Sequence, residues 1–148
     1  MMDEVNSSRL ERRWKPDIIG LTESAHAQAR KIDASFSPVA TEAQLADWES
    51  SHAIPIFPEL RDYLLVSDGL EASRGEWWPV LPISSWVVHL DACESDTPVV
   101  LFGETDVHRF AFFRNRGAQI HQIDPVTGEN TFFARGLFRY LEKLFTGQ

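Results

Sequence analysis

The sequence predicts an α+β domain in which helices pack on one side of an antiparallel sheet. Helical periodicity prevails as far as Gly69, and runs of β-branched and aromatic residues separated by tight turns follow it. An amphipathic helix then closes the chain. Tight turns between successive strands imply antiparallel pairing, so we expect the strands to form a meander.

The first expected helix follows a polar lead-in. Residues 1–15 are mostly charged or polar, and we expect them to be flexible and to precede a single domain over 16–148. Pro16 suits the first turn of a helix, and apolar residues recur at spacings of three and four until about Asp33. Residues 35–38 are interpreted as a connector.

Two more helices are expected before the sheet. Thr41 and Gln44 form a capping box at the start of the second helix, which we expect to end near Ser51. The third begins at Pro58 and is expected to end at Gly69, because glycine adopts a left-handed cap without a Cβ penalty.

The sheet and the closing helix occupy the rest of the chain. Residues 84–89 fit either a short helix or a loop over the sheet. The last helix has the clearest amphipathic spacing, with its apolar face at Leu137, Tyr140, Leu141, Leu144 and Phe145. Strands are predicted at 77–81, 98–102, 109–114, 118–123 and 130–134.

Composition and charge limit the classes of function. The 148 residues suffice for one domain, and the net charge of −8 argues against direct nucleic-acid binding, which requires a basic face. The acidity suits a basic protein partner, or marks an ordinary soluble acidic protein. A single cysteine allows no internal disulfide, and no signal peptide or membrane span is visible, so we expect a cytoplasmic protein.

Motifs for catalysis and metal binding are weak. The chain contains no phosphate-binding glycine loop and no nucleophile elbow. Two segments have ligand types at alternate positions, which would share one side of a strand and suit zinc. They are His89-Asp91-Cys93 and Glu104-Asp106-His108. Because acidic residues commonly flank solvated loops, we predict no metal at either triad. Since the chain has no catalytic motif, we also predict no cofactor and no catalytic residue.

An adjacent pair of tryptophans is the most informative aromatic feature. Trp77 and Trp78 follow Glu76 in a predicted strand. Neighbouring strand residues face opposite sides, so one indole is expected in the core and the other facing outward or onto another chain. An outward Trp beside charges is typical of a binding hot spot. Loops that shield both indoles are the alternative.

The order of motifs resembles a known superfamily. From Thr41, a capped helix, an Ile-Pro step, an aromatic-Leu helix and a Ser-Asp-Gly turn lead to a Val-Leu-Pro step. Phe102-Gly103-Glu104 ends a later strand, and Phe133-Ala134 precedes the closing helix. Over residues 38–146 this is similar to the SUKH superfamily, or Smi/Knr-like domains. The positions that match its signature are interpreted as structural: Trp48, Pro55, Tyr63, Leu64 and Gly69.

The chain departs from the family pattern at three places. Ile54 occupies a position where leucine is usual, and Asp68-Gly69-Leu70 replaces Asn-Gly-Gly. After Glu104 it has Thr105-Asp106-Val107-His108, where family members often carry small residues and glycine.

The resemblance implies a binding protein without enzymatic activity. Bacterial SUKH members are typically immunity proteins that bind and neutralise a cognate polymorphic or contact-dependent toxin domain, often a nuclease or nucleic-acid deaminase. We therefore expect a toxin with a basic surface as partner. Alternatives are an intracellular scaffold, or a small metal enzyme that uses the two triads. The expected partner-binding residues are Glu71, Glu76, Trp77, Trp78, Glu104 and Asp106.

Overall fold

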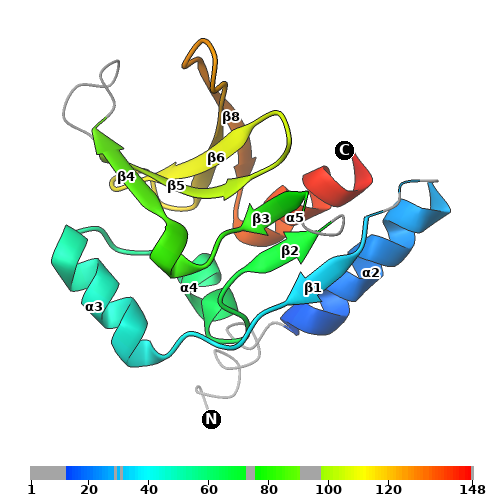
Figure 1. Ribbon diagram of the computed structural model, residues 1–148, viewed down its shortest axis with the longest axis horizontal. Helices are drawn as coiled ribbons and strands as arrows, with labels where there is room; N and C mark the ends of the chain where they lie inside the picture. Colours follow the sequence, from blue (N-terminus) through cyan, green and yellow to red (C-terminus); the bar gives the residue numbers. More distant parts are fainter. Residues whose placement is uncertain (1–12, 29, 31, 73–75, 91–97, 148) are drawn as a thin grey trace.

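The fold is an α+β domain in which helices cover one side of an antiparallel sheet, as the sequence predicts (Figure 1). A computed structural model describes residues 13–28, 30, 32–72, 76–90 and 98–147. Over these residues the α-helices are α2 (Trp14–Ala27), α3 (Glu42–His52), α4 (Pro58–Leu64) and α5 (Leu137–Thr146), and a 3-10 turn, η2, spans Ile83–Ser85. The strands are β1 (Ala34–Phe36), β2 (Leu70–Ala72), β3 (Trp77–Val80), β4 (Val87–Leu90), β5 (Pro98–Glu104), β6 (Arg109–Phe113), β7 (Gln119–Ile123) and β8 (Asn130–Arg135).

The sheet combines a meander with a divided edge. Its order is β1-β2-β3-β5-β6-β7-β8, so the four strands from β5 to β8 follow one another as expected. Strands β3 and β4 both pair with β5, which has β6 on its other edge. Trp78 of β3 is opposite Glu104, whereas β4 is opposite residues 98–101. The sheet therefore splits at η2, which connects β3 to β4.

The first helix corrects the expected boundary of the lead-in. Helix α2 begins at Trp14, whose side chain is 1% exposed and packs edge-on against the Tyr63 ring at 5.5 Å between centroids. Trp14 Nε1 donates to the Asp62 carboxylate at 3.0 Å. Trp14 and Lys15 thus belong to the folded domain. Arg13 directly precedes the helix, and residues 1–12 of the expected lead-in lie outside the described residues.

Two short strands, β1 and β2, were not predicted from the sequence. Helix α2 ends at Ala27, not near Asp33, and the chain then forms β1, where a connector was expected. Strand β1 pairs with β2, which was also not predicted. Each strand has three residues, too few for a period-two pattern to be recognised. Their pairing across 34 positions of sequence, Phe36 with Leu70, is a tertiary contact.

The second helix follows its local sequence closely. Thr41 Oγ1 accepts from the Gln44 amide at 3.1 Å, and the Gln44 side chain accepts from the Thr41 amide at 2.8 Å, which completes the predicted capping box. The helix ends at His52, one residue beyond the expected Ser51. Its Trp48 is buried and packs edge-on against Trp86 at 5.2 Å.

The third helix is shorter than expected, and Gly69 does not cap it. A non-helical connection that contains Pro55 precedes helix α4. The helix begins at Pro58, as predicted, but already ends at Leu64. Gly69 lies five residues beyond the helix with φ +122°, at the start of β2. Its carbonyl accepts from the Tyr63 hydroxyl at 2.8 Å, and burial raises the pKa of that hydroxyl. Gly69 is therefore needed for a turn that this buried bond holds.

The main core lies between the sheet and the helices. Aromatic residues of β5 and β6 (Phe102, Phe110 and Phe112) face inward, and all five predicted apolar residues of α5 are buried against this side. A smaller cluster of Val99, Leu101, Ala111 and Phe113 occupies the opposite face of the same strands. Residues 84–89 were expected to form either a short helix or a loop over the sheet. They contain the end of the 3-10 turn η2, followed by strand β4, which was not predicted.

We expect Glu59→Ala to destabilise the fold by about 1–2 kcal/mol. Helix α5 begins after Gly136, which has no capping side chain, and the Glu59 carboxylate of α4 accepts from the amides of Leu137 and Phe138 instead. Chemical denaturation measures the loss. Glu142→Ala, which removes an exposed pair with Arg139 on the same helix, is the control and should change stability by less than about 0.5 kcal/mol. Equal losses in both variants would rule out the capping role.

Candidate protein-binding site

Strand pairing brings Trp78, Glu104 and Arg109 into one row. Trp78 of β3 is opposite Glu104 of β5, and Glu104 is opposite Arg109 of β6. Directly opposite residues in antiparallel strands project from the same face. This face is turned away from the helices, because the neighbouring Phe110 points into the main core. The row continues to Ile123 of β7.

The turns beside this row are built by local hydrogen bonds. Between β5 and β6, the Thr105 hydroxyl accepts from the amides of Val107 and His108 at 3.4 and 3.2 Å. The Thr105 amide donates to the His108 carbonyl at 2.9 Å, which closes the turn. Asp106 and Val107 are left at the tip, where both are exposed. The turn therefore holds an acidic and an apolar side chain outward in a defined geometry.

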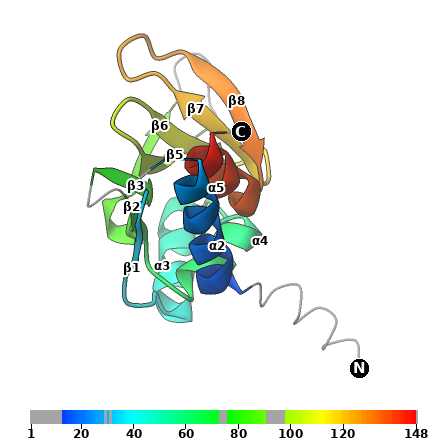
Figure 2. The ribbon, with the colours of Figure 1, turned by 90° about the vertical axis from the view of Figure 1, so that its right-hand side faces the viewer.

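A second turn, between β7 and β8, lies at the same end of the sheet. Ile123 is opposite Arg109, so the turn after Ile123 and the turn before Arg109 are neighbours. Figure 2 shows both turns, in orange and yellow, at one edge of the molecule. The amides of Thr127 and Val126 donate to the Asp124 carboxylate and hold its pKa below the ordinary value, with a smaller contribution from His108. Asp124 therefore remains ionised next to the first turn.

Together these turns and strand ends form an acidic rim. We define the rim as the carboxylates at this end of the sheet: Glu76, Glu104, Asp106, Asp124 and Glu129. Over the residues that the structure describes, none of the five forms an ion pair. Among the described residues at this end, Arg109 and His108 are basic. The five carboxylates thus outnumber the basic side chains of the described residues at this end, which gives the rim an excess of negative charge.

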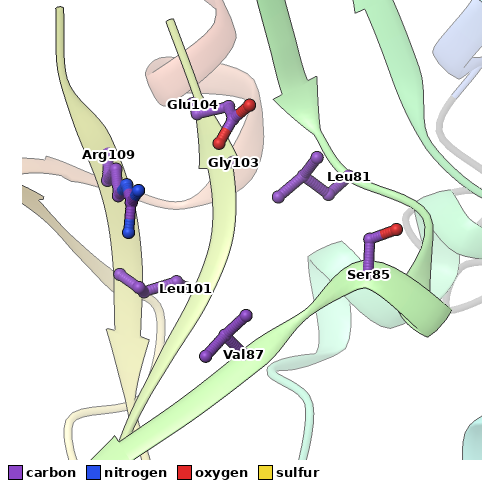
Figure 3. Close-up of a pocket in the computed structure, with 7 residues that line it drawn as sticks. All are labelled: Leu81, Ser85, Val87, Leu101, Gly103, Glu104 and Arg109. Carbon is purple, nitrogen blue, oxygen red and sulfur yellow. The ribbon is translucent and has the colours of Figure 1, made fainter.

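A small pocket opens beside the rim, where the sheet splits. Its volume is about 190 Å³. Leu81, Val87 and Leu101 supply apolar walls, with Gly103 between them. Ser85, Glu104 and Arg109 supply the polar groups. Figure 3 shows Ser85 on η2, Glu104 on β5 and Arg109 on β6, beyond β5 from η2. Glu104 and Arg109, which are opposite each other on β5 and β6, both line the pocket, and no ion pair joins them in the described structure.

The two tryptophans differ in their surroundings but share a similar exposure. Trp77 packs against the main core and is opposite Ala72, whereas Trp78 belongs to neither core cluster and is opposite Glu104. Both indoles are half-buried. The alternation that the sequence predicts is thus present in the packing, although neither ring is fully buried or fully exposed.

The structure brings most of the predicted partner-binding residues to one end of the sheet. Glu104, Asp106 and Glu76 belong to the rim, and Trp78 adjoins it. Glu71 is half-buried on β2 and points away from the core, because its neighbours Leu70 and Ala72 are both buried. Trp77 contributes mainly to the core.

Sequence reasoning missed Asp124, Glu129 and Arg109. The Asp-Pro-Val-Thr-Gly segment was recognisable as a turn, but only the strand order places it beside residues 105–108.

The two possible metal triads have different outcomes. Glu104, Asp106 and His108 do not converge, since no three metal-ligating side chains gather anywhere in the described part of the chain. Glu104 lies at the end of β5, whereas Asp106 is at the tip of the turn. In the other triad, His89 is exposed on β4, and Asp91 and Cys93 lie outside the described residues.

Comparison with known proteins assigns no family. No family model matches the chain, and no curated protein or solved structure matches it. Across the described ranges, none of the helices has the length and apolar composition needed to cross a membrane. The class that fold and site define is therefore an α+β domain with an acidic rim and an adjoining half-buried tryptophan.

Proposed function

We propose that this chain is a non-enzymatic, immunity-type protein of the SUKH kind, which binds a toxin domain through the acidic rim and blocks it. The observation that carries the proposal is that Trp78 lies opposite Glu104, at the end of the sheet along which the rim carboxylates gather. Toxins that act on nucleic acids need a basic substrate-binding face. A protein with the opposite charge is attracted to that face and covers it.

Charge and aromatic surface have separate roles in this proposal. Carboxylates at an interface mainly raise the rate of association and select basic partners. Trp78 supplies contact area, and truncating such a residue at the centre of an interface costs about 2–4 kcal/mol of binding free energy. The exposed Val107 at the tip of the neighbouring turn adds apolar surface. Steering by the rim and anchoring by these apolar groups together account for tight and specific binding.

Charge reversal of the rim tests the proposal. Toxin domains encoded beside this chain's gene are expressed with and without it, and growth is scored. We expect rescue by the natural sequence and loss of rescue by the Glu104→Lys, Asp106→Lys double variant. Its association rate with the purified toxin should fall at least about tenfold at low salt.

A matched control separates the site from the overall charge. Glu23→Lys with Asp47→Lys changes the net charge equally, at exposed positions of α2 and α3. This control should rescue growth as well as the natural sequence does. Equal loss in both double variants would show that total charge, not the rim, matters. Rescue from none of the neighbouring toxins would count against the immunity role and favour the scaffold alternative.

A further inference from the structure

We infer that the pocket beside the rim receives one arginine side chain of the protein partner. This inference deepens the proposed function, because it assigns the chemistry of the group that docks at the same site. The pocket is lined by Leu81, Val87 and Leu101 on its apolar side and by Glu104 at its acidic side. Figure 3 shows the Glu104 carboxylate and these apolar side chains around the same space.

The size of the pocket favours a single side chain. Pockets for small-molecule ligands typically have volumes of about 300–1,000 Å³, and this pocket has about 190 Å³. An apolar cavity of about 150 Å³ accommodates a benzene-sized group. The space is thus too small for most metabolites and suits one long side chain that enters from a partner's surface.

The chemistry of the walls favours arginine. The methylene stem of a long basic side chain packs against apolar surface while its charged head remains at a polar site. Leu81, Val87 and Leu101 match the stem. The Glu104 carboxylate, which forms no ion pair with any described residue, matches the head. A guanidinium forms two parallel hydrogen bonds with one carboxylate, so arginine fits better than lysine.

Arg109 also lines the pocket, and its positive charge affects arginine and carboxylate ligands in opposite ways. A carboxylate ligand would bind Arg109, and an arginine ligand would be repelled by it. The pocket opens beside the rim, whose carboxylates include Asp106 in the turn that follows Glu104, so the surrounding field favours the cation. Removal of Arg109 should therefore strengthen the binding of an arginine and weaken that of a carboxylate.

The test uses the full chain and a small probe, Nα-acetyl-arginine N-methylamide, in an NMR titration of backbone amides. We expect weak, saturable binding, with shifts confined to residues of the pocket such as Ser85, Val87 and Gly103. The uncharged norleucine analogue and the glutamate analogue should bind at least about tenfold more weakly. Equal binding of the norleucine analogue, or tighter binding of the glutamate analogue, would overturn the inference.

Three test variants and one control variant complete the experiment. Glu104→Gln should weaken the arginine probe about three- to tenfold, and Arg109→Gln should strengthen it about threefold. Val87→Trp, at a 46% exposed position, fills the pocket and should abolish binding. Val39→Trp, at a 57% exposed position before α3, is the matched control and should leave the affinity unchanged. Weaker binding by Arg109→Gln would reverse the predicted sign and exclude a cationic occupant.

The outcomes for the pocket and for the immunity role are distinguishable. Probe binding without rescue from any toxin would retain the pocket and reject the immunity role. Rescue that depends on the rim, without probe binding, would support the immunity role and reject the arginine pocket.

Discussion

Gly103→Ala should destabilise the protein by about 3 kcal/mol or more, because the position has no room for a Cβ. A Cβ at Gly103 would lie 2.2 Å from the Pro79 carbonyl oxygen and 2.6 Å from the Tyr140 hydroxyl oxygen. That hydroxyl is buried and donates to the same Pro79 carbonyl at 2.7 Å. The substitution therefore forces apart β3, β5 and α5, and it breaks the bond that joins α5 to β3.

Chemical denaturation of Gly103→Ala measures this loss, and Gly20→Ala is its control. Gly20 lies within α2, and a Cβ there would meet no atom within 4 Å. Alanine at this position should be neutral or stabilise the helix by up to about 1 kcal/mol. Unfolding of both variants at the same denaturant concentration would contradict the close approach of Gly103 to the Pro79 carbonyl and the Tyr140 hydroxyl.

The same substitution has a consequence for the candidate site. Gly103 precedes Glu104, which is opposite Trp78 across the β3–β5 contact. Separation of these strands removes Trp78 from the rim and opens the pocket, since Gly103 also lines it. We therefore expect a folded Gly103→Ala variant, at low temperature, to lose binding of a partner that Glu104→Gln only weakens.

Trp14→Ala should destabilise the protein by about 3–5 kcal/mol, the range for deletion of a buried aromatic side chain. The indole is 1% exposed and contacts the Tyr63 ring, and its Nε1 donates to Asp62 on α4. Loss of the ring leaves a cavity between α2 and α4. The midpoint of thermal or chemical unfolding measures the effect.

Ile19→Ala on the same helix is the matched control. Ile19 is 49% exposed, so its truncation should change stability by less than about 0.5 kcal/mol. A small effect of Trp14→Ala, similar to that of Ile19→Ala, would mean that residue 14 belongs to a flexible lead-in after all.

The elements predicted well are those whose signals are local. Helix α3 begins with a capping box whose two partners are three residues apart, and α5 has five apolar residues at helical spacing. The meander from β5 to β8 was predictable because its strands are separated by turn residues. Each of these signals is contained within one element or one turn.

The errors occurred where distant contacts outweigh local preference. Trp14 follows a charged segment, so its local sequence favours the lead-in, but its side chain is buried and contacts Tyr63 and Asp62 of α4. The local sequence predicts Gly69 as a helix cap, but helix α4 ends at Leu64, and Gly69 lies in the turn before β2, where its carbonyl accepts from the Tyr63 hydroxyl. Strands β1 and β2 are too short to be recognised, and they exist because they pair with each other.

By itself, the sequence determined the class of fold, the amphipathic closing helix and most of the charged and aromatic residues of the candidate site, because composition and periodicity are written along the chain. Only the tertiary structure decided that Trp78, Glu104 and Arg109 form one row, that Asp124 joins the rim, and that a pocket opens where β3 and β4 diverge. The physical reason is that adjacency across a sheet depends on strand order and register. These are set by the packing of the whole core and not by any one segment.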